Sequence, residues 1–205
     1  MDVSDIARDV FGTSYPLICR YVDILTGPGI ERGLIGPREA GRLWERHIFN
    51  SVAPAALIPA DATVVDVGSG AGLPGIPLAV LRPDLRLTLL EPLLRRYAFL
   101  VEAVADLGLG DRVEVVRGRA EDQSQARFQV VTGRAVAPFD RLLGWTHGLL
   151  SPDGQLLALK GASATEEVAA ASKTLRRFGL TAQVLPVQAH PLAEETVVIR
   201  ATRRR

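Results

Sequence analysis

Residues 62–75 read ATVVDVGSGAGLPG, and this stretch decides the fold of the 205-residue chain. Its first part, residues 63–67, is a short β-branched run, which predicts a buried strand of a parallel sheet. The glycines that follow let the backbone of a strand-to-helix turn approach a ligand closely. We therefore expect a binding site here, formed by Asp66 at the strand end together with Gly68 and Gly70.

A second acidic residue, Glu91, closes the next predicted strand. A carboxylate at this strand end can bind both ribose hydroxyls of a nucleoside. The alternative is that Glu91 only stabilises the N-terminus of the helix that begins near Pro92, through the helix dipole. The first reading indicates an adenosine-containing ligand, but it does not identify a reaction.

Predicted strands and helices alternate outward from this stretch. Strands are expected at 63–67, 86–90, 113–116, 128–132, 155–159, 182–186 and 196–201, and helices at 76–81, 93–107, 138–150 and 164–178. The alternation predicts a Rossmann-like α/β fold with a mostly parallel seven-stranded sheet. Residues 151–154 (SPDG) are typical of a turn. No helix separates the last two strands, so we expect them to add an antiparallel edge, with an antiparallel C-terminal strand.

The first 60 residues are predicted to be helical. Ser4 is expected to cap a helix over 5–10, and the TGPG sequence at 26–29 is expected to end a second helix over 15–25. A third helix is predicted from Pro37 toward Ser51. We therefore divide the chain into a small N-terminal helical extension, 1–60, and an α/β domain, 61–205.

Composition excludes several classes of protein. The chain is 47% hydrophobic, which is enough for a core, and its net charge is only +1. A single cysteine excludes an intramolecular disulfide and a cysteine-rich metal site, so we expect no metal. The N-terminus lacks the pattern of a signal peptide, and no apolar run approaches the length of a membrane span. We expect a cytoplasmic monomer that does not bind membranes.

Three arginines recur at every fourth position of the third predicted helix: Arg38, Arg42 and Arg46. This spacing places them on one helix face, where they could bind RNA phosphates, with His47 beside them. The alternative is a solvated face on which the arginines pair with Glu39 and Glu45.

Two cofactor classes fit the glycine turn. Residues 70–75 match G-x-G-x-x-G literally, as in nicotinamide dinucleotide binding, but the match begins two residues late and Pro74 disrupts the start of the helix. The negative charge of Asp66 is unfavourable beside a pyrophosphate, whereas it suits the ammonium group of S-adenosylmethionine. The turn therefore favours S-adenosylmethionine, with a nicotinamide-binding regulatory protein as the alternative.

Residues 65–83, VDVGSGAGLPGIPLAVLRP, closely resemble the glycine loop of the bacterial small-subunit ribosomal RNA guanine-N7 methyltransferases, the glucose-inhibited division protein B family. Shorter matches are RHI at 46–48 with Ser51, LE at 90–91 with Arg96, AE at 120–121, RA at 134–135 and ALKG at 158–161. One departure is Gly133, where family members often have serine.

The resemblance implies a class I methyltransferase that transfers a methyl group from S-adenosylmethionine to N7 of one guanine in 16S ribosomal RNA. Its partner would be ribosomal RNA or the small ribosomal subunit. By the same resemblance, five residues would contact the cofactor: Gly68, Leu73, Ala120, Glu121 and Arg134. The alternative function is a class I methyltransferase that acts on another RNA, a protein or a small molecule.

Guanine N7 carries a free lone pair, so its methylation requires alignment and desolvation rather than removal of a proton. The sequence accordingly offers no Cys-His or Ser-His-Asp arrangement, and we expect no general base. Arg134 and Lys160 leave the ends of the fourth and fifth predicted strands, and we expect them to position the substrate.

Overall fold

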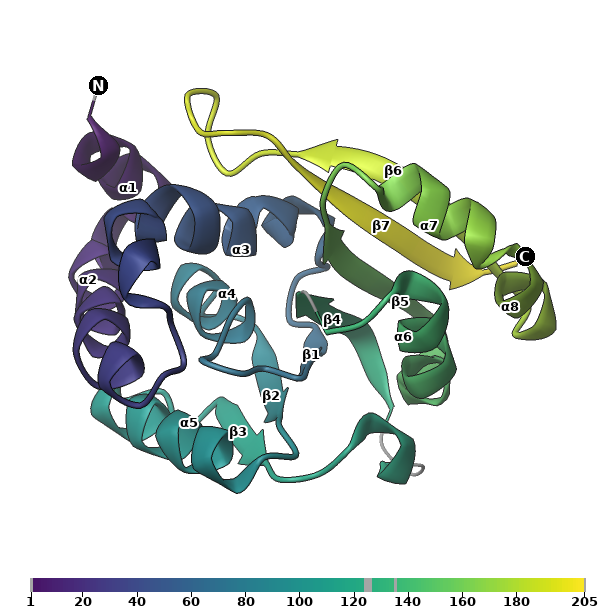
Figure 1. Ribbon diagram of the computed structural model, residues 1–205, viewed down its shortest axis with the longest axis horizontal. Helices are drawn as coiled ribbons and strands as arrows, with labels where there is room; N and C mark the ends of the chain where they lie inside the picture. The colour runs from purple at the N-terminus through teal and green to yellow at the C-terminus, as the bar shows by residue number, and fades with distance from the viewer. Residues whose placement is uncertain (1, 124–126, 135, 205) are drawn as a thin grey trace.

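The computed structural model describes residues 2–123, 127–134 and 136–204. Within them, helices cover both faces of one seven-stranded sheet (Figure 1). The strands are β1 (Thr63–Val67), β2 (Arg86–Leu90), β3 (Val113–Val116), β4 (Phe128–Arg134), β5 (Leu150–Lys160), β6 (Leu180–Val187) and β7 (Thr196–Arg203). The α-helices are α1 (Val3–Phe11), α2 (Tyr15–Ile24), α3 (Asn50–Val52), α4 (Gly75–Leu81), α5 (Leu94–Asp106), α6 (Phe139–Thr146), α7 (Ala164–Ala170) and α8 (Ser172–Arg177).

The strand order is β3-β2-β1-β4-β5-β7-β6. Strands β1 to β5 pair in parallel, and β7 is antiparallel to both of its neighbours. The order reverses at β1, where the chain leaves for β2 on one side and β4 lies on the other. In such a sheet, ligands bind beyond the carboxyl ends of the strands at this switch point. The predicted mostly parallel sheet with an antiparallel C-terminal strand is confirmed.

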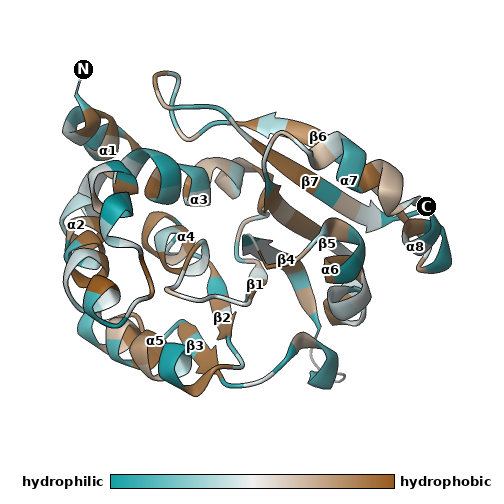
Figure 2. Cartoon of the chain, viewed as in Figure 1, coloured by the Kyte–Doolittle hydropathy of each residue, from teal (hydrophilic) through white to brown (hydrophobic). Residues whose placement is uncertain are grey.

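Alternate residues of the central strands face two separate hydrophobic clusters, as the pleat of a strand requires. Val64 packs in a cluster with the N-terminal helices, α4 and α5, whereas Val65 packs with α6, α7 and α8 on the opposite face. Figure 2 shows hydrophobic residues along much of the strands and hydrophilic residues on parts of the outer helices. A parallel sheet covered on both faces explains why residues 64–67 form an uninterrupted buried run.

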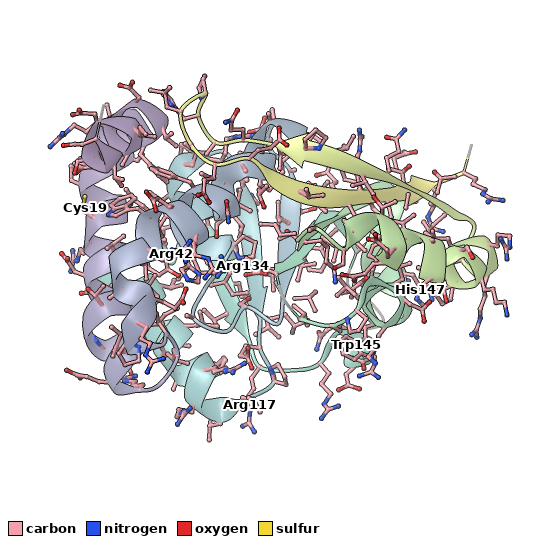
Figure 3. The ribbon with its side chains drawn as sticks, turned by 45° about the horizontal axis from the view of Figure 1, so that its top comes forward. Cys19, Arg42, Arg117, Arg134, Trp145 and His147 are labelled. Carbon is pink, nitrogen blue, oxygen red and sulfur yellow. The ribbon has the colours of Figure 1, made fainter. Side chains whose placement is uncertain are left out.

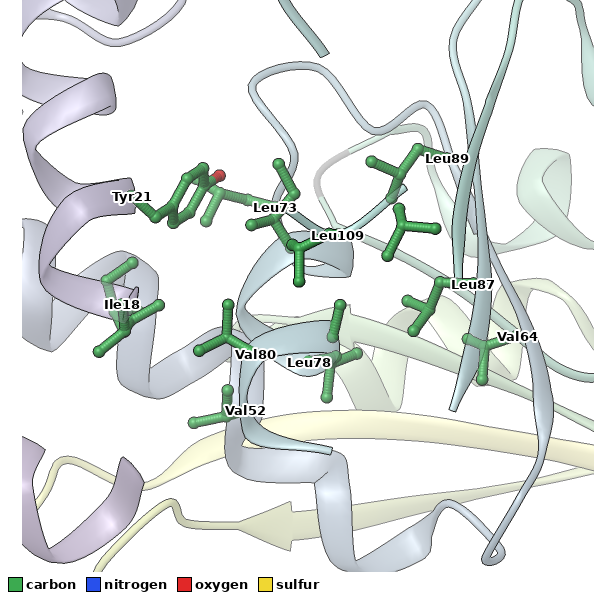
Figure 4. Close-up of a cluster of buried hydrophobic side chains, with 14 of the residues drawn as sticks. Ile18, Tyr21, Val52, Val64, Leu73, Leu78, Val80, Leu87, Leu89 and Leu109 are labelled. Carbon is green, nitrogen blue, oxygen red and sulfur yellow. The ribbon is translucent and has the colours of Figure 1, made fainter. Parts of the chain in front are cut away.

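The N-terminal helices pack directly against the element that carries the glycine turn. Ile18 and Tyr21 of α2 share one cluster with Leu73, Leu78 and Val80 (Figure 4). The buried Tyr21 hydroxyl donates to the Ala71 carbonyl at 2.8 Å, so α2 also holds the turn by a hydrogen bond. Burial raises the pKa of Tyr21 well above its ordinary value, which keeps this donor protonated.

Several predicted boundaries in this N-terminal part are wrong. Asp2, not Ser4, caps α1, because its carboxylate accepts from the Asp5 backbone in a reciprocal capping box. The TGPG sequence does not break the second helix, which continues through a π-helical turn over Leu25–Gly29. The third helix is irregular: a 3₁₀ turn over Pro37–Arg42 precedes a π-helical turn over Trp44–Phe49 and then α3.

One further correction concerns the C-terminal half. The predicted turn at 151–154 lies inside β5, where the pairing with β4 shifts from Phe128↔Leu150 to Val130↔Gln155. Those residues form a bulge, because the five-residue step on β5 faces a two-residue step on β4. The last two strands add the expected antiparallel edge, in which β7 lies between β5 and β6. No helix among the described residues is long and apolar enough to cross a membrane.

Candidate active site

The glycine turn between β1 and α4 is held by backbone hydrogen bonds to the end of β2. The Gly68 amide donates to the Leu90 carbonyl at 2.8 Å, and the Gly70 amide donates to the Glu91 carboxylate at 2.9 Å. Gly68 adopts a φ of +69°, and a Cβ there would lie 3.0 Å from Val136. Glycine is therefore required at this position both by backbone conformation and by space.

A cavity of about 560 Å³ opens beyond the carboxyl ends of β1, β2, β3 and β4. Its volume lies within the range of roughly 300–1,000 Å³ that is common for ligand cavities. Most of the predicted cofactor residues line it: Gly68, Gly70, Leu73, Glu91, Ala120, Glu121 and Arg134. Segments that are far apart in the sequence thus meet at one site, as the predicted topology requires.

Asp66 is the predicted cofactor residue that does not line the cavity. Its carboxylate is fully buried beneath the turn, where Oδ2 accepts from the Gly75 amide at 3.0 Å. Burial raises the pKa of Asp66 to about 7, and Oδ1 has no hydrogen-bond partner among the described residues. In this arrangement Asp66 fixes the start of α4 and lies behind the cavity wall.

Glu91 contacts both the glycine turn and the start of the helix that follows it. Its residue is only 1% exposed, and its two carboxylate oxygens accept from the Gly70 and Leu93 amides, each at 2.9 Å. Leu93 is the N-cap of α5, so the carboxylate does interact with a helix N-terminus. A carboxylate has about four acceptor sites. Two of them therefore remain for a ligand in the cavity that Glu91 also lines.

Arg134 connects the cavity to the irregular helical segment. Its Nη2 donates to His47 Nδ1 at 2.7 Å, and its Nη1 donates to the Arg46 carbonyl at 3.2 Å. Because a guanidinium can only donate, His47 Nδ1 must be the acceptor, and the imidazole proton lies on Nε2. His47 Nε2 donates this proton to Glu39 Oε2, and the two atoms are 2.8 Å apart. Burial lowers the pKa of His47, so the imidazole is neutral and aligned between Glu39 and Arg134.

A second, smaller cavity of about 310 Å³ shares Arg134 with the first. Its wall is formed by Arg46, Asn50, Arg134, Leu159, Lys160, Gly161, Glu167 and Thr196. The predicted positioning residue Lys160 lies here, at the end of β5, and its ammonium contacts Glu167 Oε2 at 2.7 Å. It also donates to the Ala137 carbonyl at 2.6 Å.

The predicted arginine stripe is exposed, but its geometry differs from a regular helix face. Arg38, Arg42 and Arg46 are all exposed at the surface. The 3₁₀ and π-helical turns alter the angular step between them, so fourfold spacing no longer places them in line. Arg46 lies 3.7 Å from Glu39. His47 is turned inward toward Arg134. Figure 3 shows Arg134 near the middle of the view and Arg42 to its left, on the N-terminal helical part.

Sequence reasoning missed part of the cavity wall. Leu34 and Ile35 from the N-terminal segment, Val136 after β4 and Trp145 of α6 all line the first cavity. Apolar residues in loops and at helix ends carry no spacing signal, and only the folded chain brings them to the strand ends. Ala135, part of the resembling RA pair, lies outside the described residues.

The comparison with protein families is unambiguous. The family model for GidB, the rRNA small subunit methyltransferase G, matches residues 14–196. A protein of Nocardioides sp. named ribosomal RNA small subunit methyltransferase G is 54% identical, over 97% of this chain and 80% of its own length. A protein of the same name from Renibacterium salmoninarum is 52% identical, over 97% of this chain and 93% of its own length.

Solved structures show the same fold at low sequence identity. The precorrin-6y C5,15-methyltransferase of Geobacter metallireducens superposes with a TM-score of 0.56 at 16% identity, over 84% of this chain and 91% of its own. The mitomycin 7-O-methyltransferase superposes with a TM-score of 0.61 at 22% identity, over 82% of this chain and 59% of its own. These structures establish the fold alone.

The family and the fold together imply S-adenosylmethionine as the methyl donor. The first cavity fits this molecule. It offers apolar walls, glycine backbone that a side chain would block, and two carboxylates, Glu91 and Glu121. The match over residues 14–196 and the identities above 50% over almost the whole chain lead to one conclusion: this protein belongs to the rRNA small subunit methyltransferase G family.

Proposed function

We propose that the chain transfers the methyl group of S-adenosylmethionine to N7 of one guanine in the 16S RNA of the small ribosomal subunit. The observation that carries this proposal is the pair of adjoining cavities at the carboxyl ends of the strands, with Arg134 in the wall of both. One cavity suits the methyl donor and the other suits a base beside it. Relatives that are named for the same ribosomal substrate support the choice of RNA.

The residues of the first cavity would hold the cofactor in distinct ways. Gly68 and Gly70 offer bare backbone to its methionine end, and Leu73 and Ala120 offer apolar contact. The remaining acceptor sites of Glu91 would bind the ribose hydroxyls. Glu121 and Arg134 also line this cavity, where they would contact charged or polar groups of the cofactor. When bound, the cofactor supplies an electrophilic methyl group.

The side chains around the second cavity suit alignment rather than proton removal. The Lys160 side chain is paired with Glu167, and His47 Nδ1 already accepts a hydrogen bond from Arg134. Neither group is a free base. An N7 nucleophile needs none, because its lone pair is available at neutral pH. The role that remains for Arg134 and Lys160 is to hold the base and exclude water.

The partner in this proposal is ribosomal RNA, either free or in the assembled small subunit. The protein would bind it in the cytoplasm as a monomer. Arg38, Arg42 and Arg46 lie exposed on the helical segment that supplies Asn50 and Arg46 to the second cavity. They are positioned to contact phosphates that flank the target base. Because that segment spans residues 37–57, the N-terminal extension of residues 1–60 would be the RNA-binding part, beside a cofactor domain of residues 61–205.

Mass spectrometry of ribosomal RNA nucleosides tests the proposal. A strain that lacks the protein should lose 7-methylguanosine from one position of its small-subunit RNA, and the wild-type gene should restore it. A Gly68→Val gene should not restore it, because the cofactor cavity is obstructed. Loss of a different methylated nucleoside, or an unchanged RNA together with an unmethylated protein or metabolite, would favour the alternative functions.

A further inference from the structure

Four arginines and two leucines are exposed together beyond the ends of β2 and β3. We call this set the arginine–leucine patch, and it consists of Leu93, Leu94, Arg95, Arg96, Arg117 and Arg119. The two chain segments that carry it lie side by side, because the Gly118 amide donates to the Glu91 carbonyl at 3.3 Å. Leu93, Arg96 and Arg119 also line the first cavity. The patch therefore borders the cavity that suits the methyl donor.

The arginines of the patch are not neutralised by acidic side chains. Within the described part of the chain, none of the four makes an ion pair. The nearest acidic residues in the sequence after them, Glu121 and Asp122, are exposed and do not pair with them. The α5 residue Glu102 is instead paired with Arg32, at 2.6 Å. Unpaired guanidinium groups that gather on one surface attract a polyanion, and their planar shape matches phosphate.

The two leucines add an apolar surface between these charges. Leu93 is 54% exposed and Leu94 is 58% exposed, which is unusual for large hydrophobic side chains in this protein. Adjacent exposed apolar residues often mark a surface that a partner covers. RNA offers both kinds of contact, phosphates for the arginines and the faces of unstacked bases for the leucines. An enzyme that takes one base out of its stack leaves the neighbouring bases with such exposed faces.

The patch and the second cavity lie on opposite sides of the first cavity along the sheet. The strand order places β3 and β2 on one side of β1, and β4 and β5 on the other. The patch follows β2 and β3, whereas Arg134 and Lys160 of the second cavity end β4 and β5. Figure 3 shows Arg117 well below Arg134 in the view. An RNA that reaches both places must cross the opening of the first cavity.

We propose that the arginine–leucine patch is a second RNA-binding surface, on the opposite side of the methyl donor from the target base. Its arginines contact phosphates, and its leucines contact the face of a base that neighbours the target. The bound RNA then covers the first cavity, so the cofactor enters before the RNA and is retained until the RNA leaves. This inference rests on the proposed function.

The double variant Arg95→Gln and Arg117→Gln tests the patch, because neither residue lines a cavity and glutamine removes the charge without adding repulsion. Affinity for 16S RNA, both free and in reconstituted small subunits, is measured between about 50 and 200 mM salt. The slope of log affinity against log salt should become shallower by about 0.7–0.9 for each phosphate contact that is lost. Saturating RNA should slow the release of S-adenosylhomocysteine from the wild type, and should slow it less in the double variant.

Arg86→Gln is the matched control. Arg86 is exposed at the start of β2, at the opposite end of the strand that leads to the patch, and it also makes no ion pair within the described residues. This variant should keep the wild-type slope and the slowed release. Unchanged S-adenosylhomocysteine affinity in the absence of RNA verifies that both variants are folded.

Three results would overturn the inference. The first is a wild-type salt slope in the double variant, and the second is release from the wild type that RNA does not slow. The third is a loss of subunit affinity at an unchanged slope, which would indicate a ribosomal protein as the partner of the patch. Formation of 7-methylguanosine by the wild type is measured separately in the same RNA, so the proposed function can hold when this inference fails.

Discussion

The two adjoining cavities are built in different ways. The first is lined mainly by residues of the glycine turn and by residues that follow strands β2, β3 and β4. The second is formed by side chains from four distant parts of the chain, around residues 46–50, 134, 159–167 and 196. A cavity made of local turns can be recognised in a sequence, whereas one made of side chains from distant segments cannot. The predictions below test whether the two also differ in function, with cofactor binding in the first and RNA recognition in the second.

The largest expected effect is the loss of cofactor binding in Gly68→Val. The substitution forces a branched side chain into a left-handed backbone conformation and toward Val136, 3.0 Å from the new Cβ. Strain and overpacking together should cost about 3 kcal/mol of folding stability. The displaced turn should no longer bind S-adenosylhomocysteine detectably by calorimetry. Gly108→Val is the control, because its φ of +65° is similar but nothing lies within 4 Å of its Cβ. Equal losses in both variants would contradict a direct role of the turn.

Glu91→Ala should have the next largest effect on the first cavity. It removes the acceptor for the Gly70 and Leu93 amides and the proposed ribose ligand, so cofactor affinity should fall by about 1.5–3 kcal/mol. Glu91→Gln separates the structural role from the ribose-binding role. Glutamine keeps only one carbonyl oxygen, which cannot accept from the Gly70 amide, the Leu93 amide and the ribose together. If calorimetry shows wild-type affinity for a folded Glu91→Ala protein, Glu91 acts only at the N-terminus of α5.

The pH dependence of the methyl-transfer rate tests the contact between His47 and Arg134, the residue that lines both cavities. Burial holds the pKa of His47 below its ordinary value of 6.5, so His47 is neutral above that pH and gains a proton only as the pH falls below it. The added Nδ1 proton would oppose the Arg134 guanidinium and displace it, despite the attraction of Glu39 on the other side. The charge of Arg46 also opposes this proton, whereas the charge of the Asp66 carboxylate attracts Arg134. Above pH 6.5 the single-turnover rate should not depend on His47, and as His47 gains its proton below that pH the rate should fall about tenfold.

A general base would give a profile of the same shape, so His47→Asn is the discriminating variant. Asparagine cannot remove a proton from the substrate, but its carbonyl can still accept from Arg134. We expect this variant to keep most of the wild-type rate and to lose the acidic fall. A rate that collapses at every pH would indicate a general base, and would contradict methylation at N7.

The smallest expected effect concerns the exposed arginines beside the second cavity. The double charge reversal Arg42→Glu and Arg46→Glu should weaken RNA binding and reduce the slope of log affinity against log salt by about 0.7–0.9 for each phosphate that the protein no longer neutralises. Cofactor affinity should not change. Arg176→Glu, an exposed arginine on α8, is the matched surface control. An unchanged slope in the double variant would mean that these arginines only face solvent and do not contact RNA phosphates.

The sequence by itself determined the central sheet and the glycine turn. The strands at 63–67, 86–90 and 113–116 lie where the sequence predicts them, and most of the predicted cofactor residues line one cavity. These features are local: a β-branched run, a set of glycines, and acidic residues that directly follow strands. Parallel topology then brings the strand ends together without further information.

Only the tertiary structure decided the rest. SPDG at 151–154 has the composition of a turn, yet pairing with β4 draws it into β5 as a bulge. Asp66 directly precedes the turn, but the Gly75 amide draws its carboxylate behind the cavity wall. His47 is 87 residues from Arg134 in the sequence, and their contact depends on the packing of an irregular helix against the end of β4. Such contacts depend on burial and on donors and acceptors from distant elements, which no local pattern encodes.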